Sequence, residues 1–499
     1  MKWKIVIGPP GTGKTTYLLN RIEEYLKVTA PHEIAYLTFT RKAANEGLNR
    51  AIQKFGFDPD ELPYFRTIHS LCYRWLNMKR ADVLGASDYK KLGEILGERI
   101  TGGFSDEDGI IKGSTLADRM LLLENIARSR GIPLMQQWKE SSPDFSWMHF
   151  NWLCRSYAEY KKKRYLIDYT DMLEKFLKVK EPPKLKVLFI DEAQDLSTLQ
   201  WECVKKLALY SEEVYIAGDD DQAIYKWAGA DVDEFISLEG EEIQLKQSYR
   251  IPSEVHKLSQ QIIKRNKFRR EKEWLARETK GSVSFHTSAE HIDLSKGEWL
   301  ILARNNYLLN SIEEYLKLVG VLYERNQRVS VRQKLLNAIR GWEMLRKGQA
   351  ISLDTVKNIY YFMSVDKGIV RGKKNLKGAE EDMLFNIEHL KKNHGLLVDS
   401  IWHTAFDRVG IQEREYLISC LRKEEKVTSP RIKLSTIHAA KGGESENVVV
   451  LTDMANSTWV ELGKNPDNEN RTFYVAVTRT KENLHIVMPK THKHFKIAY

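Results

Sequence analysis

Cysteine is scarce in this chain of 499 residues, and the few cysteines present are far apart. They are Cys72, Cys154, Cys203 and Cys420. No two of them form a CxxC pair, so the sequence indicates neither a zinc site nor an iron–sulfur cluster. We expect thiols that stay free in a reducing compartment.

Long apolar runs are also lacking. No stretch of about 18 consecutive apolar residues occurs, which argues against a membrane-spanning helix. The opening "MKWKIVIGPP" is interrupted by Pro9 and Pro10 too early for a signal peptide. We therefore expect a soluble cytoplasmic protein with no membrane contact.

The chain does have length and an excess of positive charge. Lys and Arg number 78 against 68 Asp and Glu, which gives a formal net charge of +10. Such an excess favours a polyanionic partner, although it is spread over a large surface. The chain is too long for one core, and about two to four compact units are expected.

The first chemical motif is a strand, a loop and a helix in succession. The β-rich run "KWKIVI" is followed by "GPPGTGKT" and then by "TYLLNRIEEYL", whose apolar residues recur at helical spacing. The loop fits G-x-x-x-x-G-K-[ST] at Gly8, Gly13, Lys14 and Thr15, a pattern whose backbone amides cradle phosphates. Lys14 would reach the β- and γ-phosphates and the Thr15 hydroxyl would hold Mg²⁺. The alternative is a glycine-rich turn without a nucleotide.

A second acidic motif, "KVLFIDEAQD", suits the other half of such a site. Its apolar run, residues 187–190, is typical of a strand covered on both faces. Asp191 follows at the carboxyl end, where ligands bind in open α/β sheets, and we expect this strand to neighbour the one before the phosphate loop. Glu192 is placed to take a proton from an attacking water. A helix-capping pair is the non-catalytic alternative.

The segment "AGDDDQAIYKWAGA", from Ala217 to Ala230, contains three consecutive carboxylates. Neighbouring side chains of an extended segment point to opposite faces, so the three should not converge on one ion. A metal cluster is therefore disfavoured here.

The order of the motifs resembles that of superfamily 1 helicases of the UvrD, Rep and PcrA group. The motifs are "GPPGTGKTT", "LTFTRKAANE", "TIHSL", "FIDEAQD", "AGDDDQAIYKWAGA", "QSYR", "STIHAAKGGESE" and "YVAVTRTK". The resemblance runs from Gly8 to about Leu484. It implies an α/β fold with two RecA-like P-loop motor domains built on parallel sheets, each interrupted by a mainly helical accessory insertion.

The resemblance also implies domain boundaries. We expect a first motor domain at 1–80 and 181–247, its helical insertion at 81–180, a second motor domain at 248–326 and 430–499, and a reduced insertion at 327–429. The first insertion contains the acidic break "SDEDG" and the basic run "KKKR", Lys161 to Arg164. That run is expected to be a solvated face, with duplex contact as the alternative. In the second insertion, apolar residues recur at helical spacing and predict an amphipathic helix; they are Leu335, Leu336, Ile339, Trp342 and Leu345.

Within the resemblance, several residues acquire roles at an ATP site. Gln222 would sense the γ-phosphate, Tyr249 would stack on adenine, and Glu444 would meet the ribose. Arg250 and Arg479 fall in motifs like the arginine fingers of the group, and a solvated surface arginine is the alternative for each. An arginine supplied by a second domain would make hydrolysis depend on closure.

The resulting assignments for ATP and Mg²⁺ are as follows. The candidate catalytic residues are Lys14, Glu192, Gln222, Arg250 and Arg479. The candidate nucleotide-binding residues are Gly8, Pro9, Gly11, Thr12, Gly13, Lys14, Thr15, Thr16, Tyr249 and Glu444, and the candidate Mg²⁺ ligands are Thr15 and Asp191.

A second set of residues resembles the segments that hold single-stranded DNA. It consists of Phe39, Thr67, His69, Tyr225, Trp227, Arg304, Thr436 and His438. Aromatic faces accept any base, worth about 1–3 kcal/mol each, and hydroxyl groups suit phosphate oxygens. The alternatives are a core tryptophan for Trp227 and hydrogen-bonded core histidines for His69 and His438. The three Asp then resemble scaffold residues.

The sequence also departs from the group. Thr16 stands where relatives often carry an adenine-stacking arginine, and no residues precede the first strand, so the upstream glutamine motif is expected to be absent. Both leave the strictness of the ATP preference open. Only twenty residues follow Arg479, so a reduced strand-separating pin is expected. The compact insertions would suit a phage member, acting in the host cytoplasm.

The resemblance therefore predicts an ATP-dependent helicase that moves 3′ to 5′ along single-stranded DNA and unwinds duplex. The alternatives are a protein-displacing remodelling ATPase that unwinds weakly and an RNA-directed motor. The expected partners are single-stranded DNA and junctions with duplex, together with replication or repair proteins. We expect a monomer associated with the nucleoid.

Overall fold

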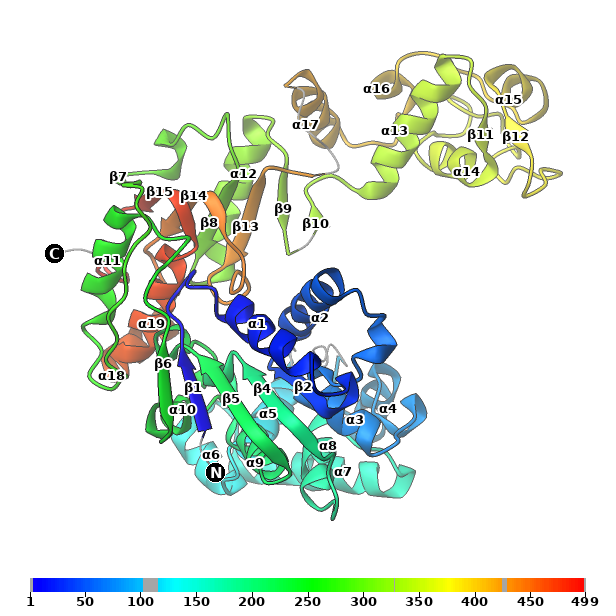
Figure 1. The fold of residues 1–499 in the computed structure, drawn as a ribbon. Helices are drawn as coiled ribbons and strands as arrows, with labels where there is room; N and C mark the ends of the chain where they lie inside the picture. The colour runs from blue at the N-terminus through cyan, green and yellow to red at the C-terminus, as the bar shows by residue number, and fades with distance from the viewer. Residues whose placement is uncertain (1–2, 102–114, 327, 424–428, 498–499) are drawn as a thin grey trace. The chain divides into compact units, whose positions relative to one another are not determined.

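The computed structural model of the protein describes residues 3–101, 115–326, 328–423 and 429–497. The chain forms two compact units, drawn in Figure 1. The first unit spans Met1–Ser282, Val460–Thr478 and Ile497–Tyr499, and the second spans Val283–Trp459 and Arg479–Lys496. The "SDEDG" break at 105–109 lies outside the described residues.

The first unit is built on a six-stranded parallel sheet with the order β3-β2-β4-β5-β1-β6. Its strands are β1 (Trp3–Ile7), β2 (Ile34–Thr38), β3 (Phe65–Thr67), β4 (Leu185–Asp191), β5 (Ser211–Gly218) and β6 (Glu241–Gln244). The sequence predicts that β1 and β4 are neighbours, and this is wrong. β5 lies between them and pairs with both.

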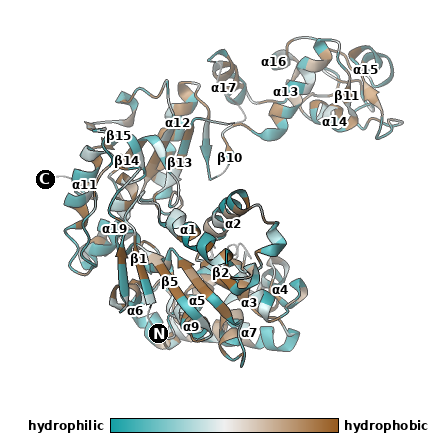
Figure 2. Ribbon diagram, in the orientation of Figure 1, coloured by the Kyte–Doolittle hydropathy of each residue, from teal (hydrophilic) through white to brown (hydrophobic). Residues whose placement is uncertain are grey.

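Helices cover both faces of this sheet, as Figure 1 shows. Helices α1 (Lys14–Leu26) and α2 (Arg41–Phe55) pack on one face, around residues such as Val6 and Phe189. Helices α3 (Ile68–Trp75), α8 (Tyr169–Leu177) and α9 (Thr198–Ala208) pack on the other, around Ile5 and Leu188. Burial on both faces explains why the strands are continuous apolar runs, seen in brown along β2 and β5 in Figure 2.

The insertion between β3 and β4 is helical in its described part. It contains α4 (Ala86–Leu96), α5 (Leu116–Ser129), α6 (Leu134–Ser141), α7 (Trp147–Arg164) and α8. The basic run at the end of α7 differs from the solvated face that the sequence predicts. Lys161 is buried and pairs with Asp168 and Asp171, whereas the three residues after it are exposed.

The chain after β6 also packs within the first unit. The sequence predicts that a second motor domain begins at 248, but the segment 248–282 lies in the first unit, where α11 (Ser253–Ile263) packs against α19 (Pro466–Val477). A short helix, α10 (Val232–Ser237), precedes β6, and α18 (Asn456–Lys464) leads into α19. The division into four domains remains a prediction.

The second unit contains a seven-stranded sheet with the order β10-β9-β13-β8-β14-β15-β7. The strands are β7 (Ser282–His286), β8 (Trp299–Ala303), β9 (Tyr323–Arg325), β10 (Arg328–Val329), β13 (Ile432–Thr436), β14 (Ser445–Leu451) and β15 (Thr480–Val487). Strands β9, β13, β8, β14 and β15 run parallel, and β10 forms an antiparallel pair with β9. Two parallel-sheet units therefore confirm the predicted α/β fold class.

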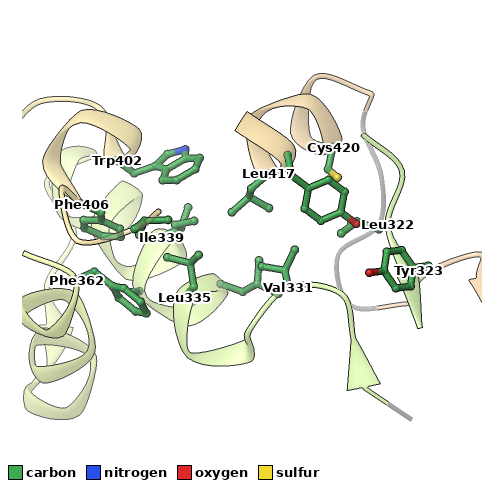
Figure 3. Packing of buried hydrophobic residues seen from close by; sticks show 14 of the residues in the cluster. Leu322, Tyr323, Val331, Leu335, Ile339, Phe362, Trp402, Phe406, Leu417 and Cys420 are labelled. Atoms are coloured by element: carbon green, nitrogen blue, oxygen red, sulfur yellow. The ribbon is translucent and has the colours of Figure 1, made fainter. Parts of the chain in front are cut away.

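The insertion in the second unit packs around α13 (Gln333–Arg346). All five apolar residues that predict this helix are buried, and Figure 3 shows Leu335 and Ile339 directed toward Trp402 and Phe406. The other elements of the insertion are α14 (Leu353–Tyr361), α15 (Ile387–Asn393), α16 (Trp402–Ala405), α17 (Ile411–Arg422) and the antiparallel pair β11 (Ile351–Ser352) and β12 (Leu384–Phe385). Helix α12 (Asn310–Leu318) precedes the insertion, between β8 and β9. The predicted amphipathic helix is confirmed.

The four cysteines are buried and free of disulfides. Among the helices that the structure describes, none has the length and apolar character needed to cross a bilayer.

Candidate nucleotide and nucleic-acid site

The loop after β1 ends in a helix N-terminus suited to an anion. The N–H of Gly8 donates to the carbonyl of Gly218 at the end of β5, 3.1 Å. Thr12 folds the loop back, because its hydroxyl donates to the Pro9 carbonyl, 2.8 Å. Gly13, in the left-handed region with φ 80°, caps α1 without a side chain. The first-turn amides of α1 are therefore open to a phosphate.

Lys14 lies over this loop. Its Nζ donates to the Gly8 carbonyl, 2.9 Å, and lies 3.9 Å from Oε1 of Glu192. A Cβ on Gly8 would approach Cγ of Lys14 to 2.0 Å, so the close packing requires glycine. Thr16, the residue that departs from the group, is exposed in the first turn of α1.

Thr15 and Asp191 meet although their strands are not adjacent. The Thr15 hydroxyl donates to Oδ2 of Asp191, 2.9 Å, and the Tyr36 hydroxyl donates to the same oxygen, 2.6 Å. Asp191 is 2% exposed, and burial, together with the nearby Glu192 charge, raises its pKa above the usual value. Burial also raises the pKa of Tyr36 well above its usual range, with Asp191 adding to the effect.

This pair of oxygen donors fits Mg²⁺. Mg²⁺ is usually bound through one or two protein oxygens, with waters and substrate phosphates completing its shell. The described residues contain no group of three or more His, Cys, Asp or Glu side chains that could hold a metal ion by themselves. Thr15 and Asp191 therefore suit a metal that arrives with a nucleotide.

Glu192 is connected to the next strand by a glutamine that the sequence analysis missed. Glu192 has φ 53°, a left-handed conformation that is uncommon for a residue other than glycine and typical of functional sites. Gln194, fully buried, donates through Nε2 to Oε2 of Glu192, 2.6 Å, and accepts through Oε1 from the N–H of Asp219, 3.0 Å. Its place in "DEAQD", beside the two predicted acids, was the available signal.

The three consecutive aspartates converge on one cation, so the prediction that their side chains would not meet at one ion is wrong. The premise of an extended segment fails, because Asp220–Gln222 form a 3₁₀ turn, η5. All three carboxylates lie within 3.1 Å of Nζ of Lys272. The cation is a side chain rather than a metal ion, which agrees with the scaffold interpretation. Lys272 was missed because it is remote in sequence.

Two further contacts define the surroundings of these carboxylates. Arg269 forms a bidentate pair with Asp221, with Nε 2.8 Å from Oδ1. Gln222 donates through Nε2 to Oδ2 of Asp219, 2.7 Å. The predicted γ-phosphate sensor is therefore held by a buried carboxylate.

The "QSYR" segment packs directly on the phosphate loop. The Ser248 hydroxyl donates to the Pro10 carbonyl, 2.7 Å, and the Tyr249 N–H donates to the Gly11 carbonyl, 2.9 Å. Gly11 has φ +73°, and a Cβ there would lie 2.4 Å from Cβ of Arg250. Arg250 therefore lies against the loop within the first unit. The Tyr249 side chain is 74% exposed and available for stacking.

The aromatic candidates of the first unit form a series. The ring centroid of Phe39, after β2, lies 5.5 Å from that of Tyr225, which lies 6.4 Å from that of Trp227 in η6 (Lys226–Ala228). Trp227 is 47% exposed, which excludes the core-tryptophan alternative. Phe39 and Tyr225 also line a small pocket with His69.

Thr67 and His69 have structural partners. The Thr67 hydroxyl accepts from the Ser70 N–H, 3.2 Å, and so caps α3. His69 is buried with its ring edge-on to Tyr169, and burial lowers its pKa to about 4 despite an opposing influence from Asp168. Its surroundings are those of a core histidine, but Nδ1 has no hydrogen-bond partner among the described residues, so the alternative of a hydrogen-bonded core histidine is met only in part.

The candidates of the second unit lie at the two opposite ends of its strands, and the carboxyl ends of the parallel strands together form one edge of the sheet and the amino ends the other. Arg304 follows β8, and Thr436 ends β13, which is paired in register with β8 so that Thr436 is opposite Ala303. His438 follows two residues later. These three candidates for strand contact therefore share the carboxyl edge.

The other edge carries Glu444 and Arg479, which precede the paired parallel strands β14 and β15. Glu444 pairs with Lys481, 2.8 Å. Arg479 is buried and its Nη1 lies 3.4 Å from the Gly443 carbonyl oxygen, to which it donates. The nucleotide candidates of this unit are thus separated from the strand candidates by the length of the sheet.

Comparison with known proteins shows two family matches. Residues 2–243 match the UvrD/REP helicase N-terminal domain, and residues 309–491 match the UvrD-like helicase C-terminal domain. The chain is 26% identical over 367 residues to the ATP-dependent DNA helicase PcrA of Bacillus subtilis, covering 66% of this chain and 46% of the relative. It is 28% identical over 291 residues to PcrA of Staphylococcus aureus strain Mu50, covering 54% and 39%. The chain thus spans less than half the length of these relatives.

Proposed function

The chain belongs to the UvrD/Rep family of helicases, and from this premise we propose that it is an ATP-dependent DNA helicase. It would step 3′ to 5′ along single-stranded DNA and separate duplex ahead of it. The observation that carries the proposal is the short segment from Asp219 to Trp227. It connects Gln222 to Glu192 through Asp219 and Gln194, and it ends in the aromatic series with Phe39.

The nucleotide half of the cycle follows from the contacts at the phosphate loop. Lys14 would exchange the Gly8 carbonyl and Glu192 for the phosphates. This exchange would release Glu192 from Lys14, and Glu192 could then take a proton from water. Thr15 and Asp191 would hold Mg²⁺, which neutralises charge on the phosphate oxygens when bound.

Two arginines are proposed to stabilise the charge that develops on the γ-phosphate. Arg250 is supported by its packing against Gly11. Arg479 is supported by its motif and by its place at the same sheet edge as Glu444. An arginine that approaches only on closure would couple hydrolysis to movement.

The strand half of the cycle depends on stacking. One base stacked on an aromatic side chain is worth about 1–3 kcal/mol. Separating one base-pair step requires about 1.4 kcal/mol. A strand held by Tyr225 and Trp227 could therefore resist re-annealing between steps, without reading the base sequence. The segment "GDDDQAIY" supports 3′ to 5′ movement, because it resembles the branch with that polarity rather than the proline-containing one.

The test compares duplexes that carry a 3′ or a 5′ single-stranded tail, with ATP hydrolysis followed in parallel. We expect hydrolysis to be stimulated by single-stranded DNA and unwinding to require the 3′ tail. Lys14→Ala should abolish both. Displacement of a bound protein without unwinding would favour the remodelling ATPase. Stronger stimulation by single-stranded RNA would favour the RNA-directed motor, and no stimulation by either strand would reject the proposal.

A further inference from the structure

The buried Lys272 lies outside all of the sequence motifs quoted above, although it contacts one of them. It lies in the segment between α11 and β7, is 8% exposed, and contacts the carboxylates of Asp219, Asp220 and Asp221. Burial acts to lower the pKa of Lys272, but the three carboxylates outweigh it and hold the pKa above its usual value. The side chain therefore stays a cation in a site closed to solvent.

Asp219 connects this cation to the proposed catalytic groups. One of its oxygens, Oδ1, lies 3.1 Å from Nζ of Lys272, and the other accepts from Gln222, 2.7 Å. Its N–H donates to Gln194, which in turn donates to Glu192. The sensor glutamine and the proposed base are thus both linked to Asp219, the glutamine through the carboxylate and the base, by way of Gln194, through the main-chain N–H.

We propose that Lys272 is a positioning residue for ATP hydrolysis, which keeps Asp219 ionised and in place so that Gln222 and Glu192 are oriented together. The inference rests on the proposed function. Three carboxylates in a dry site repel one another. Without Lys272, Arg269 would still pair with Asp221, but Asp219 or Asp220 would take up a proton or move away. A protonated or displaced Asp219 would no longer fix the Gln222 amide.

Helix α19 joins the same cluster from a distant part of the chain. Arg471 of α19 donates through Nε to the Asp220 carbonyl, 2.9 Å, and through Nη2 to the Phe268 carbonyl, 2.7 Å. Asp220 is one of the residues that pair with Lys272, and Phe268 lies four residues before Lys272 in the same segment. The chain then continues from α19 into Arg479 within a few residues. The turn that holds Gln222 is therefore anchored to the helix that leads to the second candidate arginine.

Arg269 provides a matched control within the same cluster. It is also a cation with a buried carboxylate partner, but that partner is Asp221, which contacts Asp219 through its main-chain N–H, 3.2 Å, and not through the carboxylate that Arg269 holds. Loss of Arg269 should therefore lower stability and leave the two glutamines oriented.

The experiment measures kcat and KM for ATP in the presence of single-stranded DNA, with the thermal midpoint as a stability readout. We expect Lys272→Met to lower kcat about tenfold to a hundredfold, the range seen when an outer partner of a site residue is lost. KM for ATP should stay within about threefold, because the phosphate loop is intact. Arg269→Met should lower the thermal midpoint and keep kcat within about threefold. Equal loss of kcat in both variants, or none in Lys272→Met, would overturn the inference.

A second variant keeps the test decisive if Lys272→Met does not fold. Asp220→Asn combined with Lys272→Met removes one carboxylate with the cation and restores the charge balance, but leaves Asp219 without its partner. We expect it to fold and to retain the low kcat, and a normal kcat would reject the positioning role. An intact chain without DNA-stimulated hydrolysis would contradict the proposed function. An active intact chain with an equally active Lys272→Met would contradict this inference alone.

Discussion

Replacing Gly11 with alanine should destabilise the first unit more than an equivalent glycine substitution elsewhere. A Cβ at this position would lie 2.4 Å from Cβ of Arg250 and 2.9 Å from Oγ of Ser248. Cβ of Arg250 is fixed to the backbone and Oγ of Ser248 is held by its hydrogen bond to Pro10, so the "QSYR" segment would have to move away. Its two hydrogen bonds to the loop, from Ser248 to Pro10 and from Tyr249 to Gly11, would then be strained.

The magnitude follows from two contributions. Gly11 has φ +73°, and the left-handed region costs a residue with a Cβ about 1–2 kcal/mol. Forcing extra volume into packed surroundings costs about 1–3 kcal/mol more. Gly56, at the end of α2, has φ +75° and no atom within 4 Å of an added Cβ. Gly56→Ala therefore carries only the first contribution, about 1–2 kcal/mol, against about 2–5 kcal/mol for Gly11→Ala.

Urea denaturation of the two variants and the intact chain, without nucleotide, measures both free energies of unfolding. Nucleotide affinity provides a second readout, which Gly11→Ala should weaken and Gly56→Ala should leave unchanged. Equal destabilisation by the two substitutions would refute the argument, because it would mean that Arg250 does not rest on the loop in solution.

Three other predictions concern single side chains. Burial lowers the pKa of His69 from 6.5 to about 4, so between these pH values the unfolded chain binds a proton that the folded chain excludes. This contribution to stability is complete above pH 6.5 and is lost as the pH falls toward 4. The total loss is about 3 kcal/mol. Denaturation at several pH values should show a flatter profile for His69→Gln than for the intact chain, and an equally steep profile would contradict the reasoning. Trp227→Leu should weaken binding of a fluorescent single strand by about 1–3 kcal/mol, and Trp152→Leu, at a comparably exposed tryptophan of α7, should not. Asp191→Asn should raise the Mg²⁺ concentration needed for half-maximal hydrolysis, and an unchanged requirement would remove Asp191 from the metal site.

Local patterns in the sequence predict much of the nucleotide site. The change from β-rich to helical spacing around Gly8 locates the phosphate loop, and the apolar run before Asp191 locates the acidic strand. Each pattern extends over only a few consecutive residues, and over such short distances in the sequence hydrophobic periodicity and turn residues predict structure well. The order of β4 and β5 in the sheet is not encoded locally, which explains the wrong neighbour predicted for β1.

Contacts between distant residues account for the rest. Lys272 is some fifty residues from the three aspartates, and a lysine in a charged stretch looks solvated in sequence. The convergence of the carboxylates also depends on a 3₁₀ turn, which three consecutive aspartates do not predict. The packing of Tyr249 on Gly11 likewise assigns the segment 248–282 to the first unit through contacts that no periodicity reveals.

The central claim is that one short segment couples the nucleotide to the strand, and the affinity for single-stranded DNA with and without a non-hydrolysable ATP analogue tests it most directly. The intact chain should change its DNA affinity when the analogue binds, by about 5–150-fold, and DNA should change the affinity for the analogue by the same factor. The Gln222→Ala variant should still bind each ligand, but the factor by which one ligand changes the affinity for the other should fall toward one. Identical DNA affinities of the intact chain with and without the analogue would contradict the account.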